Sequence, residues 1–281
     1  MAAKIRVTAI QRLCVNDGPG VRTVVFLKGC YLECPWCCNP EAIHYEGDEY
    51  FDKGRCKCPE KNPICRNCEL HGGNMPKDGC PFGGYEKTYK DYTADELYGL
   101  LMRDEPLYRD GGGVTFSGGE PLLQAFAIKP LLQRLRKENV HIAFETTLYA
   151  PREQYQAVKE YVDYWLVDLK FQFGYIANRD YDIGIHRFEE NLLDLQSLGR
   201  DILYRMVGME EMMSLKNKIV NDLLMHEITK LEILDYHGLA ENKYKQLDKS
   251  FKPFKKLTDV DIKEIDYLFS ISGIITEYKR L

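Results

Sequence analysis

The chain lacks a run of basic residues, an apolar stretch long enough to cross a membrane, and an apolar segment close to its first residues. Its 43 Asp and Glu outnumber its 38 Lys and Arg, for a net charge of −5, and this balance disfavours nucleic-acid binding. The first residues, Met-Ala-Ala-Lys-Ile-Arg-Val-Thr, do not have the pattern of a signal peptide. We therefore expect a cytoplasmic protein that binds neither nucleic acid nor a membrane.

Cysteine, by contrast, is abundant, with ten residues in the chain. In a reducing cytosol such thiols serve as metal ligands more often than as disulfides. Cys30, Cys34 and Cys37 follow the spacing C-x3-C-x2-C, which lets one tight loop offer three thiolates to a cubane iron–sulfur cluster. The fourth iron then has no protein ligand and is open to a substrate. A zinc knuckle or a disulfide cluster is the alternative, although zinc normally takes a closed set of four ligands, often in paired C-x2-C units.

Chain length predicts the number of domains, and the alternation of apolar segments predicts the fold class. The 281 residues, 44% of them hydrophobic, fit one domain with a small insertion. Apolar runs of strand length alternate with segments of helical period, which is typical of an α/β protein with a parallel sheet. The expected strands are Thr23–Lys28, Gly113–Ser117, His141–Thr146, Tyr164–Lys170, Ile202–Val207 and Leu231–Asp235. The expected helices are Thr93–Arg103, Gln124–Glu138, Arg152–Tyr161, Arg187–Leu198 and Glu210–His226, and a last helix and strand are expected at Asp259–Phe269 and Ile274–Tyr278.

Residues 46–89 interrupt this alternation. The segment is rich in Gly, Pro, Lys and Cys and has neither helical nor strand period. A structureless segment this long inside a compact domain needs something else to hold it, and metal ligation is the expected means. Its cysteines are Cys56, Cys58, Cys65, Cys68 and Cys80. We therefore divide the chain into a main unit, 1–45 with 90–281, and a cysteine-rich insertion, 46–89.

Polar residues follow several expected strands. Gly118, Gly119 and Glu120 follow one strand, where glycines permit close backbone approach and a carboxylate can accept from an ammonium group. Each motif is weak alone, because Gly-Gly-Glu turns are common and strands usually end in polar residues. The side chains at the ends of later strands are Glu145, Asp168, Lys170 and His237. Functional side chains of α/β barrels gather at the carboxyl ends of strands, so we expect a site there; His237 is alternatively an ordinary loop residue.

The cysteine loop, with Trp36 inside it, resembles that of the radical S-adenosylmethionine (SAM) enzymes. The match extends to Asp17–Arg22, Asn39–Glu41, Thr115–Gln124, Glu145–Thr146, Asp168–Lys170, Tyr236–His237 and Lys243–Tyr244, which together resemble the glycyl-radical-enzyme activating enzymes. The resemblance covers nearly the whole chain. It implies a partial (β/α)6 TIM-like barrel, open where a glycine loop of a protein substrate enters, and hydrogen abstraction from the Cα of that glycine.

The resemblance also implies cofactors and their residues. A [4Fe-4S] cluster on Cys30, Cys34 and Cys37 would bind SAM at its open iron and cleave it to methionine and a 5′-deoxyadenosyl radical. No side chain is assigned a catalytic role, because the cofactor carries the radical. The implied cofactor-binding residues are Trp36, Gly118, Gly119, Glu120, Glu145, Asp168, Lys170, Arg205 and His237. Lys170 would hold the carboxylate of SAM, Glu145 and Asp168 a monovalent cation, and Trp36 the adenine unless it only packs beneath the loop.

Many members of the family carry a ferredoxin-like insertion where residues 46–89 lie. The two-cluster form needs eight cysteines and this segment has five, so the resemblance implies one second [4Fe-4S] cluster, on Cys65, Cys68, Cys80 and either Cys56 or Cys58. A zinc site is the rival, since His71 adds a nitrogen ligand. A glycyl radical enzyme is the implied partner, with a flavodoxin or ferredoxin as electron donor.

The substrate half departs from the family. Residues 171–187 lack the family's Thr-Gly pair, Val207 replaces a proline, and Met209–Met213 replaces an Asn-Asp. These changes leave open a radical SAM enzyme acting on a small molecule or peptide, and a non-catalytic electron-transfer protein. Met206, Met209, Met212 and Met213 are either helix core or an adaptable apolar site. Cys14 and Cys38 have no assigned role.

Overall fold

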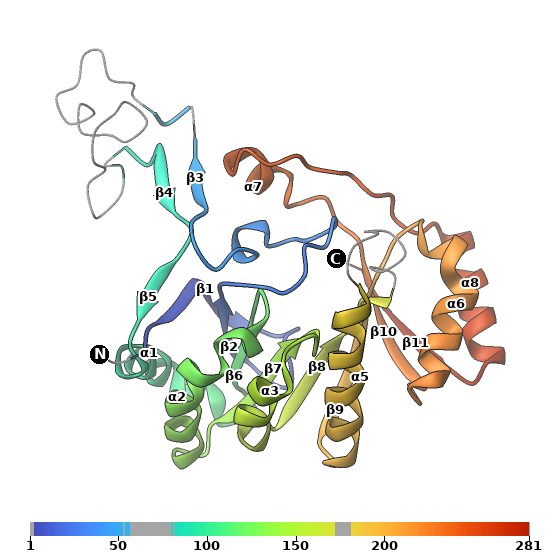
Figure 1. Ribbon diagram of the computed structural model, residues 1–281, viewed down its shortest axis with the longest axis horizontal. Coiled ribbons are helices and arrows are strands. Elements are labelled where there is room, and N and C mark those ends of the chain that lie inside the picture. The colour runs from blue at the N-terminus through green and yellow to red at the C-terminus, as the bar shows by residue number, and fades with distance from the viewer. Residues whose placement is uncertain (1–2, 53, 57–79, 81, 172–180, 281) are drawn as a thin grey trace.

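The computed structural model describes residues 3–52, 54–56, 80, 82–171 and 181–280. Within this part, nine strands form one open sheet in the order β11-β10-β9-β8-β7-β6-β2-β1-β5 (Figure 1). The strands are β1 (Ile5–Cys14), β2 (Arg22–Leu27), β5 (Lys90–Tyr92), β6 (Gly113–Gly118), β7 (His141–Thr146), β8 (Tyr164–Asp168), β9 (Asp201–Gly208), β10 (Lys230–Asp235) and β11 (Ile275–Lys279). Pairing is parallel from β2 through β11, whereas β1 is antiparallel to both of its neighbours.

Helices connect successive parallel strands, as the alternation predicts. They are α1 (Ala94–Leu101), α2 (Ala125–Lys137), α3 (Arg152–Val158), α5 (Tyr181–Ser197), α6 (Met212–Met225), α7 (Glu241–Gln246) and α8 (Asp259–Ile271). Figure 1 shows α2, α3 and α5 following one another along one side of the sheet, and consecutive helices pack against each other. A capping box at Thr93 and Glu96 starts α1. The predicted α/β fold with a partial, open barrel is confirmed.

The core lies between these helices and the sheet. Successive residues of a strand point to opposite faces, so on β6 Phe116 faces the helices while Thr115 and Ser117 face the inside of the curved sheet. The rings of Phe116, Phe144 and Trp165 come from three adjacent strands, with centroids 5.5 and 5.6 Å apart. The ring of Tyr155 on α3 continues the row, 5.7 Å from Trp165. Met206, Met209 and Met212 are fully buried in the same core and Met213 is half-buried against it, which favours the interpretation of the four methionines as core residues.

The structure adds elements that the sequence did not reveal. Strand β1 covers one edge of β2, and the short helix α7 follows β10. The margins of the cysteine-rich segment, expected to be without strands, pair as β3 (Glu49–Phe51) and β4 (Tyr85–Lys87). Cys56 and Cys80 are half-buried near this ribbon, whereas Cys58, Cys65, Cys68 and His71 lie outside the described residues. Within the part described, no helix has the length and apolar content needed to cross a bilayer.

A buried arginine connects three neighbouring strands at the amino end of the sheet. Arg22 is fully buried, and it donates to Thr115 Oγ1 at 2.6 Å and to the carbonyl of Val114 at 2.7 Å. Its Nη1 lies 3.3 Å from Nδ1 of His141, the first residue of β7. Burial, and then the charge of Arg22, lower the pKa of His141 below its ordinary 6.5. The imidazole therefore stays neutral in the folded protein at pH values where it is protonated in the unfolded chain.

This difference predicts a pH dependence of stability. As pH falls through 6.5, the unfolded chain takes up a proton at His141 that the folded protein does not bind, so the free energy of unfolding decreases until the lower, folded pKa is passed. In the His141→Gln variant this loss is expected to be absent. Chemical denaturation of both proteins between about pH 7.5 and 5.5 measures the difference. Equal losses in the two proteins would show that His141 does not titrate as described.

Candidate active site

The cysteine loop begins directly after β2, at the carboxyl end of the parallel strands. Two backbone hydrogen bonds close its neck, from Gly29 N to Ala42 O at 2.7 Å and from Cys30 N to Ile43 O at 2.8 Å. Residues 29–43 thus form a closed loop, which we call the cluster loop. It contains all three cysteines of the C-x3-C-x2-C motif.

The three cysteines of the cluster loop are half-buried. Burial raises the pKa of Cys30 and of Cys34 to about 12, and it raises the pKa of Cys37 as well. A thiol in such surroundings keeps its proton unless a metal takes the proton's place. Among the described residues, no three Cys, His, Asp or Glu side chains converge on the position of one metal ion. A cubane cluster binds each cysteine at a different iron, so it does not need such convergence, and the three thiols fit it.

The Gly-Gly-Glu turn packs against the neck of the cluster loop. Gly119 N donates to Leu27 O at 2.8 Å, and Glu120 N donates to Gly29 O at 2.7 Å. A Cβ on Gly118, whose φ is +111°, would lie 2.3 Å from the backbone of Leu27, and one on Gly119 would lie 2.1 Å from Gly29 O. Both glycines are therefore required by the contact between two backbones. The turn fixes the position of the cluster loop whether or not it also contacts a ligand.

The side chain of Glu120 is fully buried and accepts four hydrogen bonds. Oε1 accepts from Thr146 Oγ1 at 2.6 Å and from Leu122 N at 3.1 Å, while Oε2 accepts from Thr147 N at 2.9 Å and Thr147 Oγ1 at 2.7 Å. A carboxylate has about four acceptor positions, and all are in use. Burial raises the pKa of Glu120, and the Thr146 and Thr147 hydroxyls oppose that shift. This carboxylate fastens the turn to the end of β7.

Replacing Glu120 with Gln tests this fastening. The amide nitrogen of Gln would replace one carboxylate oxygen of Glu120. The two donors that this oxygen accepts from would then have no acceptor. We expect the free energy of unfolding to fall by about 3 kcal/mol, the cost of a few such losses in a buried site. Urea denaturation of the metal-free protein measures it. The matched control is Glu153→Gln, on the exposed side of α3; identical midpoints for the two variants would contradict the assignment.

Lys170 and Asp168 form an ion pair at the end of β8. Their Nζ–Oδ2 distance is 2.6 Å, and Lys170 is 7% exposed. Burial alone would lower the pKa of Lys170, but the charge of Asp168 raises it above its ordinary value. The charge of Lys170 in turn acts on the thiols of Cys30 and Cys37. The structure therefore brings this predicted pair together with the cluster loop. Oδ1 of Asp168 is buried and, among the described residues, has no hydrogen-bond partner.

Glu145 and Arg205 belong to an ionic network inside the curved sheet. Ser117 Oγ donates to Glu145 Oε2 at 2.5 Å, and Arg205 Nη1 lies 3.5 Å from Glu145 Oε1. Nε of Arg205 lies 2.6 Å from Oε2 of Glu232. Burial raises the pKa of Glu145; Arg205 lowers it, and the charge of Asp168 raises it further. Glu145 and Asp168 thus repel each other, and a bound cation would relieve that repulsion.

Aromatic contacts connect the cluster loop to the segment after β10. Trp36 is 6% exposed, and its ring meets Phe254 edge-on with centroids 6.0 Å apart. Phe254 in turn contacts the ring of Tyr236 at 5.7 Å. These contacts agree with Trp36 packing beneath the loop, and its contact with adenine stays a prediction. Next to Tyr236, Nδ1 of His237 is buried without a hydrogen-bond partner in the described part of the chain, so it is available to a ligand.

Helix α7 supplies contacts that the sequence interpretation did not assign. Lys243 Nζ donates to Glu41 Oε1 at 2.6 Å, to Asn39 Oδ1 at 2.9 Å and to Cys38 O at 3.2 Å. The hydroxyl of Tyr244 donates to Cys37 O at 3.2 Å. Both residues matched the family pattern, but nothing in their local sequence tells what they contact. They hold the cluster loop at its third cysteine.

Comparisons with known proteins agree with this site. Residues 16–181 match the protein family described as a 4Fe-4S single cluster domain. In fold, the chain resembles a radical SAM methyltransferase from Sphaerobacter thermophilus, with a TM-score of 0.53 and 13% identity, covering 99% of this chain and 73% of that one. The family match defines a protein with a 4Fe-4S cluster domain, and the structural similarity shows the fold.

Two relatives narrow the class. Pyruvate formate-lyase 2-activating enzyme of Escherichia coli is 34% identical over 88% of this chain and 82% of its own length. The 4-hydroxyphenylacetate decarboxylase activating enzyme of Clostridioides difficile is 30% identical over 94% of this chain and 93% of its own. The chain belongs to the radical SAM activating enzymes of glycyl radical enzymes. It is therefore an enzyme, and the non-catalytic interpretation is wrong.

Proposed function

We propose that this enzyme cleaves SAM reductively and abstracts a hydrogen atom from a glycine Cα of one partner enzyme. The observation that carries the proposal is the sequence similarity to two activating enzymes, 34% and 30% identical, over most of each chain. Their names give different partners, pyruvate formate-lyase 2 and 4-hydroxyphenylacetate decarboxylase. The partner of this chain is thus a glycyl radical enzyme whose identity is set by segments such as residues 171–213, which depart from the family pattern.

The proposed cofactor site uses the carboxyl edge of the sheet. When bound, a [4Fe-4S] cluster on Cys30, Cys34 and Cys37 supplies the electron that splits SAM into methionine and a 5′-deoxyadenosyl radical. Lys170 neutralises the methionyl carboxylate. The Gly118–Glu120 turn binds the amino group of SAM. Because the carboxylate of Glu120 already accepts four hydrogen bonds, the backbone of the turn makes this contact.

The remaining predicted residues complete the site. His237 donates to, or accepts from, the nucleoside through its unpartnered Nδ1, and Trp36 closes the adenine side. Arg205 fixes the orientation of Glu145. The open oxygen of Asp168 and the repulsion between Asp168 and Glu145 support a monovalent cation there.

The cysteine-rich insertion, 46–89, is proposed to bind a second [4Fe-4S] cluster through Cys65, Cys68, Cys80 and one of Cys56 or Cys58, with zinc as the rival metal. The rest of the chain, 1–45 and 90–281, forms the radical SAM unit. A flavodoxin or ferredoxin in the cytoplasm is the proposed electron donor.

Anaerobic incubation tests the proposal. The reconstituted enzyme is mixed with SAM, dithionite and a candidate partner, and electron paramagnetic resonance (EPR) is recorded. A glycine-centred doublet on the partner, absent when its radical glycine is replaced with Ala, is the expected result. Deuterium transfer from a labelled small molecule or peptide into 5′-deoxyadenosine, with no doublet on any glycyl radical enzyme, would favour direct action on that substrate.

A further inference from the structure

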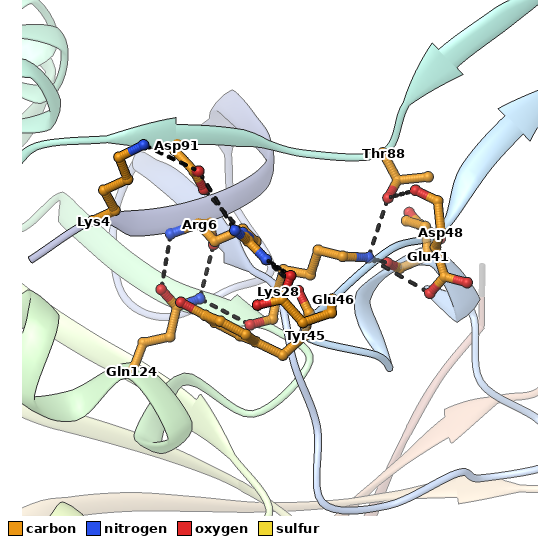
Figure 2. Close-up of polar contacts among 10 residues, drawn as sticks. All are labelled: Lys4, Arg6, Lys28, Glu41, Tyr45, Glu46, Asp48, Thr88, Asp91 and Gln124. Carbon is orange, nitrogen blue, oxygen red and sulfur yellow. Dashed lines mark hydrogen bonds and ion pairs between the residues drawn. The ribbon is translucent and has the colours of Figure 1, made fainter. Parts of the chain in front are cut away.

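A buried lysine spans the neck of the cluster loop. Lys28 immediately precedes the loop and is 0% exposed. Its Nζ donates to Glu41 O at 2.5 Å and to Thr88 Oγ1 at 3.1 Å, and lies 3.6 Å from Asp48 Oδ2 (Figure 2). Two of the three donors of this ammonium group thus have a hydrogen-bond acceptor, and the carboxylate of Asp48 is its ion-pair partner. Lys28 is not among the residues that the sequence assigned to the site.

These acceptors come from two parts of the chain. Glu41 belongs to the cluster loop, whereas Asp48 and Thr88 stand at the two ends of the cysteine-rich insertion, before β3 and after β4. Thr88 Oγ1 also donates to the carbonyl of Asp48 at 2.8 Å, which joins the two ends of the insertion directly. One ammonium group therefore connects the cluster loop to the base of the insertion.

The surroundings leave Lys28 little freedom. Its backbone N donates to Arg6 O at 3.0 Å, and Gln124 Nε2 donates to the carbonyls of both Lys28 and Arg6 at 2.8 Å. Arg6 is itself held by Asp91 at 2.9 Å (Figure 2). These hydrogen bonds fix the backbone of Lys28 to the sheet. A displacement of its partners Glu41, Thr88 or Asp48 would therefore pull on the first residues of the cluster loop.

The acceptors are held from the other side by the C-terminal segment. Lys249 Nζ lies 2.9 Å from Asp48 Oδ1, and Lys243 Nζ lies 2.6 Å from Glu41 Oε1. Asp48 has a φ of +59°, a left-handed conformation that Asp tolerates better than most residues. Burial lowers the pKa of Lys28 and the charge of Asp48 raises it. A buried charge is costly unless such partners remain in place.

We propose that Lys28 is a positioning residue that couples the base of the cysteine-rich insertion to the cluster loop, so that the placement of Asp48 and Thr88 sets the geometry of the loop's cysteines. The partners of its ammonium group are Glu41, Thr88 and Asp48, so the proposed role acts through these residues. The inference goes beyond the proposed function and rests on it only in taking Cys30, Cys34 and Cys37 as the cluster ligands.

The test replaces residues at the base of the insertion and measures hydrogen exchange in the cluster loop. Thr88→Val keeps the shape of the side chain and removes the acceptor, Thr88→Ser keeps the hydroxyl, and Asp48→Asn removes the charge. Lys87→Met, an exposed neighbour on β4, is the control. Hydrogen–deuterium exchange of the metal-free protein is followed in peptides covering residues 29–43. We expect exchange there to be about tenfold faster in Thr88→Val and Asp48→Asn, the factor given by roughly one lost hydrogen bond, and unchanged in Thr88→Ser and Lys87→Met.

The second readout is the EPR spectrum and midpoint potential of the reduced cluster after reconstitution. Both are expected to shift in Thr88→Val and Asp48→Asn and to return in Thr88→Ser. Unchanged loop exchange in Thr88→Val, or acceleration spread evenly over the whole protein, overturns the proposal. The exchange measurement needs neither cluster nor SAM cleavage, so its outcome is independent of whether the proposed function holds.

Discussion

Replacing Cys34 with Ala is expected to abolish formation of 5′-deoxyadenosine and to remove the cluster that binds SAM. Cys34 is the middle cysteine of the closed cluster loop, and the charge of Lys170 acts on it more strongly than any other neighbouring charge. Two thiolates cannot hold a cubane in place of three. The reconstituted variant should therefore lose about four irons relative to the wild type, one cubane's content. Iron analysis and chromatography of the SAM products under dithionite measure both effects.

The matched control is Cys38→Ala. Cys38 adjoins the loop's third cysteine, and its side chain is exposed. It has no place in the C-x3-C-x2-C spacing, so this variant should keep the iron and the 5′-deoxyadenosine yield of the wild type. If Cys34→Ala cleaved SAM at the wild-type rate, or if Cys38→Ala were equally inactive, the assignment of the cluster to Cys30, Cys34 and Cys37 would be wrong.

The sequence predicted the parallel strands because each is a short apolar run, buried by helices on one face. It missed β1, although Ile5 and Val7 alternate with polar residues there and are both buried. This alternation covers only the first residues of β1, because the later residues of the strand are exposed or half-buried. It also missed α7, since six residues with one buried tyrosine carry too little period to be recognised.

The site was predicted where spacing along the chain is enough. Asp168 and Lys170 are two residues apart at a strand end, which places them on the same face, and the structure pairs them. The donors that Thr146 and Thr147 supply to Glu120, and the partners of Lys28, come from other segments of the chain. Thr88 is 60 residues from Lys28, and no local pattern encodes such a contact. For the same reason the contact of the turn's glycines with the backbone of Leu27 and Gly29 was not predicted, and their contact with a ligand stays a prediction.

Replacing Lys170 with Met should weaken SAM binding about 100-fold, because a charge-assisted hydrogen bond to a carboxylate contributes roughly 1.5–3 kcal/mol. The same change leaves the half-buried Asp168 unpaired, which lowers the free energy of unfolding by about 1–3 kcal/mol. The double variant Asp168→Asn/Lys170→Met removes that unpaired charge. It should recover stability without recovering SAM affinity, and this combination separates ligand binding from folding.

Equilibrium dialysis of SAM against the reconstituted proteins, alongside urea denaturation, measures the two quantities. The control is Lys159→Met, since Lys159 also forms a largely buried ion pair, at 2.7 Å with Asp194, but lies beside α3 and away from the cluster loop. It should lose stability and keep its SAM affinity. Wild-type affinity in the double variant would show that Lys170 serves the fold alone and that the methionyl carboxylate is bound elsewhere.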